Sequence, residues 1–208
     1  MKRNYPFTGV LFLIIAALTV GSVHAQESKE KSTKKMPNQE EMMKKWEASM
    51  TPGEPHKKLA AMVGTWDAEV KSWMNGPSGE PTVSAGSSEF TSALGGRFVQ
   101  ETFTSTMMNQ PFSGMGYTGY DNFKKKYVGF WIDNMTTSMM STEGTEDKSG
   151  TLTMWGKMDD PMTGQKDKKF KSVSRFDGPD KMVFDMYDVT TYGDKKPIME
   201  ITYTRKKS

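Results

Sequence analysis

The sequence of 208 residues contains no cysteine and only two histidines, His24 and His56. Without cysteine, the chain forms no disulfide and offers no thiolate as a nucleophile or metal ligand, so its stability has to come from packing. A serine nucleophile needs a base within hydrogen-bond reach, and so few histidines give no recognisable catalytic triad. The composition therefore favours neither a disulfide-bonded scaffold nor a thiol or serine hydrolase.

Long hydrophobic runs are also scarce. The apolar run from Val10 to Val20 is about half of the ~20 residues that span a bilayer. Two basic residues precede it, and Val23-His24-Ala25 follows it as a cleavage site. This pattern predicts a signal peptide over residues 1–25, cleaved before Gln26, and an exported protein that is periplasmic or secreted. A retained anchor is the competing interpretation, whereas a lipid anchor would require a cysteine at the cleavage site.

The mature chain also lacks an excess of charge of one sign. Loss of Lys2 and Arg3 with the signal peptide lowers the formal net charge from +3 to +1. Lysines gather at residues 124–126 and 166–171, but acidic residues lie among them and no helix is expected to collect them into a stripe. We therefore expect no nucleic acid partner and no membrane span, and the expected partner is a small apolar molecule.

The rest of the chain divides into three segments. Residues 26–37 consist largely of Lys, Glu, Ser, Thr and Gln, which predicts a disordered tether. Residues 38–53 predict an amphipathic helix, and residues 54–208 predict one barrel domain. Removing residues 1–25 from the 208 leaves a length typical of one domain with a tail.

The predicted N-terminal helix has a clear start and one apolar face. Asn38 is followed three residues later by Glu41, which is typical of a helix cap. Met42, Trp46 and Met50 then recur along one side. We expect this face to dock on the domain, and a mobile lid over the mouth of the barrel is the functional alternative.

From Trp66 onward the apolar residues recur with period 2. Trp66, Ala68 and Val70 alternate with charged residues, which indicates an antiparallel strand with one face in solvent. Turn signals separate the later strands: Gly95-Gly96, Asp121-Asn122, Asp160-Pro161-Met162-Thr163-Gly164, Gly178-Pro179-Asp180 and Gly193-Asp194. The pattern predicts about ten strands, which could close around a cavity or form an open two-sheet sandwich.

Several segments in order resemble the bacterial family known as domain of unknown function 1579. They are Pro55-His56-Lys57-Lys58-Leu59, Gly64-Thr65-Trp66, Leu94-Gly95-Gly96-Arg97-Phe98, Gly119-Tyr120-Asp121-Asn122, Trp131-Ile132-Asp133, Asp160-Pro161-Met162-Thr163-Gly164 and Glu200-Ile201-Thr202-Tyr203-Thr204-Arg205-Lys206. The resemblance covers roughly residues 40–206. More distantly, the chain resembles lipocalin, fatty-acid-binding and nitrobindin-like barrels.

This resemblance implies an all-β fold, an up-and-down antiparallel calycin-like barrel preceded by short N-terminal helices. In such barrels a tryptophan of the first strand lies over the barrel floor, and a basic residue of the last strand packs its cation on the indole. Gly64, Trp66 and Arg205 are the residues expected in these structural roles. The resemblance also implies non-enzymatic binding of a small molecule, an inference from fold analogy.

A hollow barrel would have a lining of inward-facing side chains, apolar with a few polar anchors. The predicted lining residues are Met115, Tyr117, Trp131, Asp133, Ser172, Ser174, Phe184, Met186 and Tyr203. Between residues 170 and 176 these serines alternate with Lys171 and Arg175, so cations are expected outside the barrel. The alternative is a barrel filled by its own side chains, acting as a structural or protein-interaction module in the cell envelope.

Acidic residues provide the only hint of an enzyme, which is our third hypothesis. Asp133 shares a face with Tyr127 and Trp131, so it is either a buried acid or the start of an exposed turn with Asn134. The other strand carboxylates, Glu101 among them, are expected to point mostly at solvent. Paired acid and base roles, and hence catalytic residues, are not assigned.

Neither a metal nor another cofactor is predicted. Nitrobindin-like barrels supply a haem-ligating histidine from their late strands, whereas His56 precedes the first strand and is expected at the surface or in a helix cap. Methionine or tyrosine ligation of haem is a minor alternative. Methionine pairs could bind Cu(I), but neighbours in a strand point to opposite faces. Loss of Met1 with the signal peptide leaves 18 of the 19 methionines, and we expect them mainly to fill the core and line an adaptable pocket.

Overall fold

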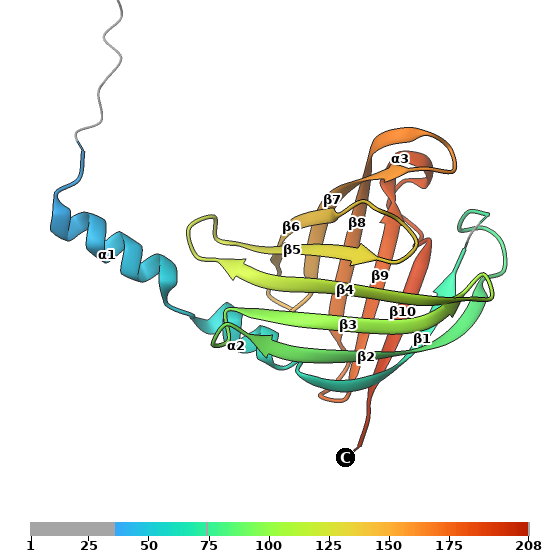
Figure 1. The fold of residues 1–208 in the computed structure, drawn as a ribbon, viewed down its shortest axis with the longest axis horizontal. Coiled ribbons are helices and arrows are strands. Elements are labelled where there is room, and N and C mark those ends of the chain that lie inside the picture. The colour runs from blue at the N-terminus through green and yellow to red at the C-terminus, as the bar shows by residue number, and fades with distance from the viewer. Residues whose placement is uncertain (1–35, 74, 208) are drawn as a thin grey trace, which may run out of the picture. The chain divides into compact units, whose positions relative to one another are not determined.

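The computed structural model describes residues 36–73 and 75–207 (Figure 1). The predicted signal peptide and most of the predicted tether lie outside the described residues. None of the helices in the described part of the chain is long and apolar enough to cross a membrane.

The helix predicted after Asn38 is α1, Gln39–Met50. The Asn38 side chain accepts a hydrogen bond of 2.8 Å from the Glu41 backbone nitrogen, as the sequence pattern predicts. The apolar face of α1 does not dock on the barrel as expected, since no α1 residue is buried and Trp46 is 56% exposed. Instead, hydrogen bonds hold the last turn: Asn122 Nδ2 donates to three carbonyls between residues 48 and 51.

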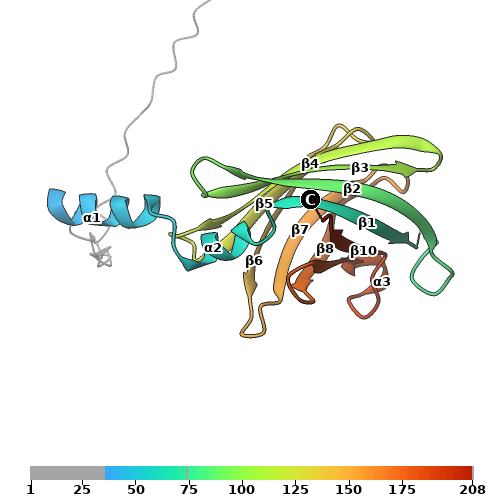
Figure 2. The same ribbon diagram turned by 90° about the horizontal axis from the view of Figure 1, so that it is seen from below.

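The next helix, α2 (Glu54–Ala60), leads directly into the barrel. His56 caps its first turn, because His56 Nδ1 accepts a 3.0 Å hydrogen bond from the Gly53 backbone nitrogen. The ring is buried and lies edge-on to Tyr120, with centroids 5.9 Å apart. Leu59 is also buried, so α2 contributes to the core as it packs against β3 and β4 (Figure 2).

Ten strands form one closed antiparallel barrel, which confirms the predicted fold class. They are β1 (Gly64–Ser72), β2 (Thr82–Ala93), β3 (Phe98–Met107), β4 (Gln110–Asp121), β5 (Lys126–Asp133), β6 (Met140–Glu146), β7 (Leu152–Asp160), β8 (Gln165–Phe176), β9 (Lys181–Asp188) and β10 (Met199–Arg205). Each strand pairs with its neighbours in sequence, and β1 pairs with β10 to close the barrel. Figure 1 shows β2–β5 crossing in front of β8–β10, so the wall forms two crossed layers.

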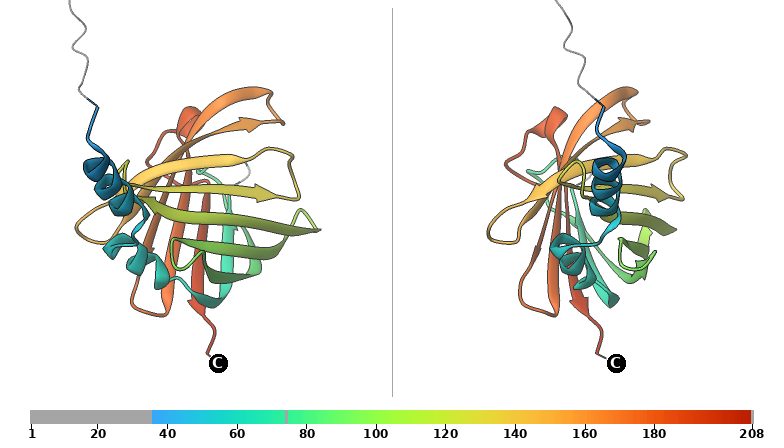
Figure 3. Two further views of the ribbon diagram at one scale, coloured as in Figure 1. Left: turned by 60° about the vertical axis from the view of Figure 1, so that its left-hand side comes forward. Right: turned by 90° about the vertical axis from the view of Figure 1, so that its left-hand side faces the viewer.

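The two longest connections are the one between β1 and β2 and the one that contains α3 (Val189–Tyr192), between β9 and β10; the others are short. Four predicted turn segments join β2 to β3, β4 to β5, β7 to β8 and β8 to β9. The fifth, Gly193-Asp194, follows α3. The two ends of the barrel therefore differ: α2 lies at one end, as Figure 3 shows, and α3 packs on β8 and β9.

Gly64, Trp66 and Arg205 pack together at the α2 end of the barrel. Trp66 is fully buried, and the guanidinium carbon of Arg205 lies 4.0 Å from the centre of its indole. Arg205 also donates hydrogen bonds of 2.7 and 2.8 Å to the carbonyls of Ala61 and Val63. Gly64 has a φ of +132°, and a Cβ there would lie 2.7 Å from Arg205 Nη1, so both conformation and space require glycine.

The side chains of β4 point in the direction opposite to the prediction. Met115 and Tyr117 of β4 were expected inside the barrel, but they point outward, with Met115 37% exposed and Tyr117 stacked on Phe130. The inward positions on either side of Met115 are glycines 114 and 116, over which the Trp131 indole of β5 lies. A Cβ at residue 116 would lie 2.8 Å from Trp131 Cε3. The large indole therefore occupies the interior space that β4 leaves empty.

Candidate functional site

The barrel encloses a cavity of about 480 Å³ on the far side of the Trp66 core. On the strands that line it, the lining residues are those farther from the α2 end: on β3, for example, Glu101 and Phe103 border the cavity, whereas Val99 does not. A second depression of about 500 Å³ lies between the loops at residues 134–138 and 159–166. Because only the first is surrounded by the barrel wall, it is the candidate site.

Methionines and aromatic rings make up most of the cavity wall. The methionines are Met107, Met108, Met135, Met140, Met186 and Met199, and the inward-facing aromatic residues are Phe103, Phe112, Trp131, Phe170, Phe184 and Tyr203. Unbranched, polarisable methionine side chains adapt to ligands of different shape. Such a wall suits an apolar ligand better than a strongly polar one.

Six of the nine predicted lining residues border the cavity: Trp131, Asp133, Ser172, Phe184, Met186 and Tyr203. Met115 and Tyr117 do not, since they lie on the outer face of β4. Ser174 shares the inward face of β8 with Ser172 but lies one step nearer the α2 end, where it pairs with Leu152 and Phe184. It is partly buried and does not border the cavity.

Glu101 provides a carboxyl group at the inner end of the cavity, opposite to the expectation that it faces solvent. Its Oε1 accepts hydrogen bonds from Ser88 Oγ at 2.7 Å and from the Tyr203 hydroxyl at 3.1 Å. Burial raises the pKa of Glu101 to about 7, although both hydrogen bonds act to lower it. The carboxyl therefore exchanges its proton near neutral pH.

A local signal for Glu101 was present in the sequence. On β3, Val99, Glu101 and Phe103 share one face, and both apolar neighbours are buried. Alternation places the carboxyl between them, on the inside of the barrel. Its donor Tyr203 comes from β10, and the pairing of these two side chains across the barrel depends on closure of the fold.

Tyr203 is itself buried, and burial together with the nearby Glu101 raises the pKa of its hydroxyl well above the usual range. The phenol therefore stays protonated and donates to the carboxyl. Its ring lies edge-on to Phe90 at 5.9 Å, so packing in the core fixes the position of the hydroxyl. Glu101 is held by rigid neighbours from two other strands.

Asp133, at the end of β5, combines both roles considered for it. Its Oδ1 accepts hydrogen bonds from the backbone nitrogens of Met135 at 3.0 Å and Thr136 at 3.1 Å, as expected for the start of a turn. Its Oδ2 accepts a 3.2 Å bond from Trp131 Nε1, and the partly buried side chain borders the cavity. Asp133 therefore orients the indole that forms part of the wall.

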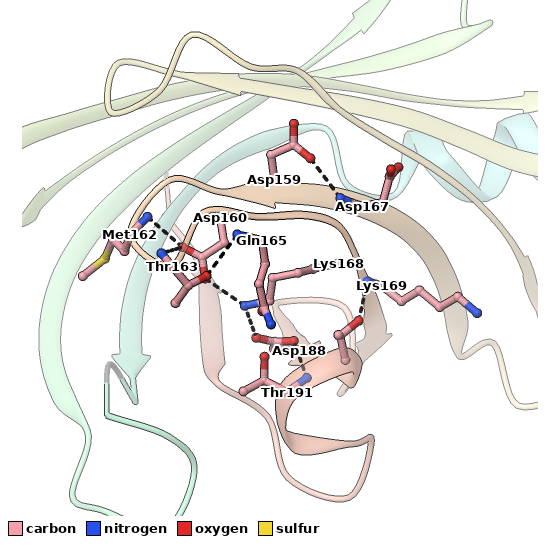
Figure 4. Close-up of polar contacts among 11 residues, drawn as sticks. Asp159, Asp160, Met162, Thr163, Gln165, Asp167, Lys168, Lys169, Asp188 and Thr191 are labelled. Atoms are coloured by element: carbon pink, nitrogen blue, oxygen red, sulfur yellow. Dashed lines mark hydrogen bonds and ion pairs between the residues drawn. The ribbon is translucent and has the colours of Figure 1, made fainter.

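A buried ion-pair cluster lies beside the second depression (Figure 4). Lys168 continues the inward face of β8, and its Nζ lies 2.9 Å from Asp160 Oδ2 and 2.7 Å from Asp188 Oδ2. Burial alone would lower the pKa of Lys168, but the bonds to Asp188 and Asp160 raise it. The alternation between residues 170 and 176 predicts an outer position for Lys171 and Arg175, and it does not extend to the buried Lys168.

The cluster connects two elements of the barrel rim. Asp160 Oδ1 also accepts hydrogen bonds from the backbone nitrogens of Met162 and Thr163, which shapes the turn between β7 and β8. Asp188 accepts a 3.0 Å bond from the Thr191 nitrogen and caps α3. Because each acid is occupied by the turn or helix it stabilises, the cluster has a structural role.

Two pairs of neighbouring methionines, at residues 107–108 and 139–140, lie at the ends of strands. Met140 borders the cavity, while its neighbour Met139 is 61% exposed. Met107 and Met108 both border the cavity because Met108 lies in the turn after β3. Among the described residues, no group of three or more His, Cys, Asp or Glu side chains is arranged to hold a metal ion.

The fold has a counterpart among solved structures. The crystal structure of Rv2717c from M. tuberculosis matches with a TM-score of 0.57 and 15% sequence identity, covering 75% of this chain and 100% of that one. At this identity the match supports the fold alone. No curated protein shows significant similarity to the sequence. The model of the family described as Protein of unknown function (DUF1579) matches residues 51–205, and the chain belongs to this family.

Proposed function

We propose that this protein binds a small, mostly apolar molecule non-covalently inside the barrel. The observation that carries the proposal is the cavity of about 480 Å³, walled by methionine and aromatic side chains. Small-molecule sites commonly measure ~300–1,000 Å³ and combine apolar walls with a few polar groups. Glu101, Ser172 and Asp133 supply such polar groups.

The cavity also bears on the alternative of a filled barrel. Toward α2 the core rings pack against one another: Phe90 lies edge-on to both Trp66 and Tyr203. Beyond Glu101 the inward side chains leave the central space open. A module that served only as a scaffold would gain stability by filling that space, because cavities cost free energy.

We further propose that binding takes place outside the cytoplasm, on the basis of the signal-peptide pattern in residues 1–25. An exported binding protein of this kind would meet its ligand in the periplasm or medium. A ligand of low water solubility suits the methionine-rich wall of the cavity.

The test compares substitutions on the two faces of one strand. Ser172 borders the cavity, and Ser172→Phe should fill part of it, whereas Val173→Phe changes the outer face next to it. We expect a neutral apolar fluorophore, N-phenyl-1-naphthylamine, to bind the wild type and the Val173 variant alike. Its affinity for the Ser172 variant should fall at least ~10-fold, about 1.4 kcal/mol.

Circular dichroism and the thermal midpoint Tm establish that each variant is folded. The proposal fails if the wild type does not bind the fluorophore, or if both variants bind it as tightly as the wild type does. Weakening by Val173→Phe alone would place the site outside the barrel and would also refute the proposal.

A further inference from the structure

The charged side chains that border the cavity all have the same sign. Glu101 and Asp133 are acidic, and none of the described residues that line the cavity is Lys, Arg or His. The lysines of β8 do not alter this, since Lys168 is held by Asp160 and Asp188 outside the lining and Lys169 is exposed. A ligand inside the barrel therefore meets negative and no positive protein charge.

Glu101 has one oxygen engaged and one available. Oε1 accepts both hydrogen bonds, from Ser88 and Tyr203. Oε2 accepts no hydrogen bond from the described residues. Every fully buried side-chain oxygen in this part of the chain has a hydrogen-bond partner, so Oε2 is not fully buried and is open to the cavity. Both bonds come from hydroxyl donors, which stabilise a carboxylate better than a neutral acid.

The rings beside Glu101 also suit a cation. Tyr203 and Phe103 border the cavity next to Glu101, and Trp131 faces it from β5. Aromatic faces attract ammonium groups, and this attraction is strongest where water is excluded. A carboxylate ligand would instead be buried against an acid of the same sign, which is costly in an apolar site.

Building on the proposed function, we infer that the ligand is an apolar molecule that carries an amine, with its ammonium group bound by Glu101 Oε2 and its apolar body among the methionines farther from the α2 end. Anionic amphiphiles such as free fatty acids are then poor ligands. Glu101 sets specificity, while the apolar wall supplies the main part of the affinity.

Three probes with the same twelve-carbon chain separate these contributions: dodecylamine, dodecan-1-ol and dodecanoate. Each competes with N-phenyl-1-naphthylamine for the wild-type protein at pH 7.5, below its micelle concentration. We expect dodecylamine to bind at least ~10-fold more tightly than dodecan-1-ol, and dodecanoate to bind most weakly.

Two variants locate the preference. Glu101→Gln keeps an acceptor for Ser88 and Tyr203 but removes the charge, and should reduce the preference for the amine over the alcohol to less than ~3-fold. Glu89→Gln removes the same charge from the exposed outer face of β2 and should leave the preference unchanged. Unchanged binding of the alcohol shows that the cavity of each variant is intact.

The outcomes distinguish this inference from the proposed function. If the alcohol binds as tightly as the amine to the wild type, or if dodecanoate binds most tightly, the inference is wrong while cavity binding stands. A preference that survives Glu101→Gln would equally refute the role of Glu101. If N-phenyl-1-naphthylamine itself does not bind the wild type, the proposed function fails; if it binds but none of the three probes displaces it, only the inference is wrong. The wild-type comparison is decisive even if a variant does not fold.

Discussion

At the scale of single residues, Arg205 joins three parts of the chain. Its guanidinium lies on the Trp66 indole, hydrogen-bonds the carbonyls after α2, and lies 3.3 Å from Asp180 Oδ1 in the turn between β8 and β9. Trp66 Nε1 in turn donates a 2.8 Å bond to the Met62 carbonyl. The pair therefore closes the α2 end of the barrel and has no direct contact with the cavity.

Trp66→Ala should lower the free energy of unfolding by roughly 3–5 kcal/mol, because it removes a fully buried indole and its partner for Arg205. Urea denaturation measures the change. Trp155→Ala is the matched control: this side chain is 45% exposed on the outer face, so its removal should cost less than about 1 kcal/mol. A loss below about 1 kcal/mol for Trp66→Ala would contradict the role assigned to it.

Glu101 should make stability depend on pH. Its pKa is raised from 4.5 to about 7 in the folded protein, so between these values the folded state binds more protons than the unfolded state. The contribution of Glu101 is therefore most favourable below pH 4.5 and is lost as the pH rises through 7. The full change is at most roughly 3 kcal/mol.

The measurement is urea denaturation of the wild type and Glu101→Gln from pH 4 to 8. Glutamine does not titrate, so the difference between the two proteins isolates this carboxyl group from all other ionisable groups. We expect the wild type to lose stability relative to the variant as the pH rises. Parallel curves would show that Glu101 is not desolvated in the folded state.

At the scale of secondary-structure elements, the Lys168 cluster ties the turn between β7 and β8 to α3. Lys168→Met would leave Asp160 and Asp188 without their cation, and we expect Tm to fall by roughly 5–10 °C at pH 7. Lys169→Met, at the exposed neighbouring position, should change Tm by less than about 2 °C.

Acid should reduce the difference in Tm between Lys168→Met and the wild type. The bond from Lys168 holds the pKa of Asp160 well below its ordinary value of 3.8, and the pKa of Asp188 is lowered as well, because its bonds to Lys168 and Thr191 outweigh burial. Their contribution is present above that ordinary value and is lost as the pH falls through the lower folded values. Equal Tm values for Lys168→Met and the wild type at pH 7 would contradict the structural role of the cluster.

Sequence patterns predicted the strands themselves but not every side chain that faces the interior of the barrel. The ten strands were predictable because period-2 alternation and turn residues mark each strand locally. The face of β4 was not, because its inward glycines are explained only by Trp131 of the neighbouring strand. The alternation on β3 was sufficient to place Glu101 inside, but its pairing with Tyr203 on β10, like that of Lys168 with Asp188 at the end of β9, depends on another strand.

At the scale of the whole molecule, the pairing of β1 with β10 turns a row of local hairpins into a closed wall. Closure brings Glu101 and Tyr203 together across 102 residues of sequence and encloses the cavity. The resemblance to calycin barrels indicated this closure, whereas periodicity alone fitted an open sandwich equally well. The empty space beyond Glu101 depends on side-chain packing, so only the structure reveals it.

The proposal of export concerns the whole chain. Expression with its own leader in a bacterial host should give a periplasmic or secreted protein whose first residue is Gln26, because cleavage is expected after Ala25. N-terminal sequencing and intact mass measure this directly. A protein that retains residues 1–25 in the membrane fraction would contradict the prediction and support the anchor interpretation.

Native mass spectrometry of the protein purified gently from its own cell envelope, compared with the same sample after denaturation, tests ligand binding most directly. We predict an additional non-covalent mass on the wild type that denaturation releases, with a much lower occupancy for Ser172→Phe. An accurate released mass would also give the elemental composition of the ligand and show whether it contains nitrogen, as an amine requires. Identical native and denatured masses for the wild type, or equal occupancy in the cavity-filling variant, would contradict ligand binding in the barrel.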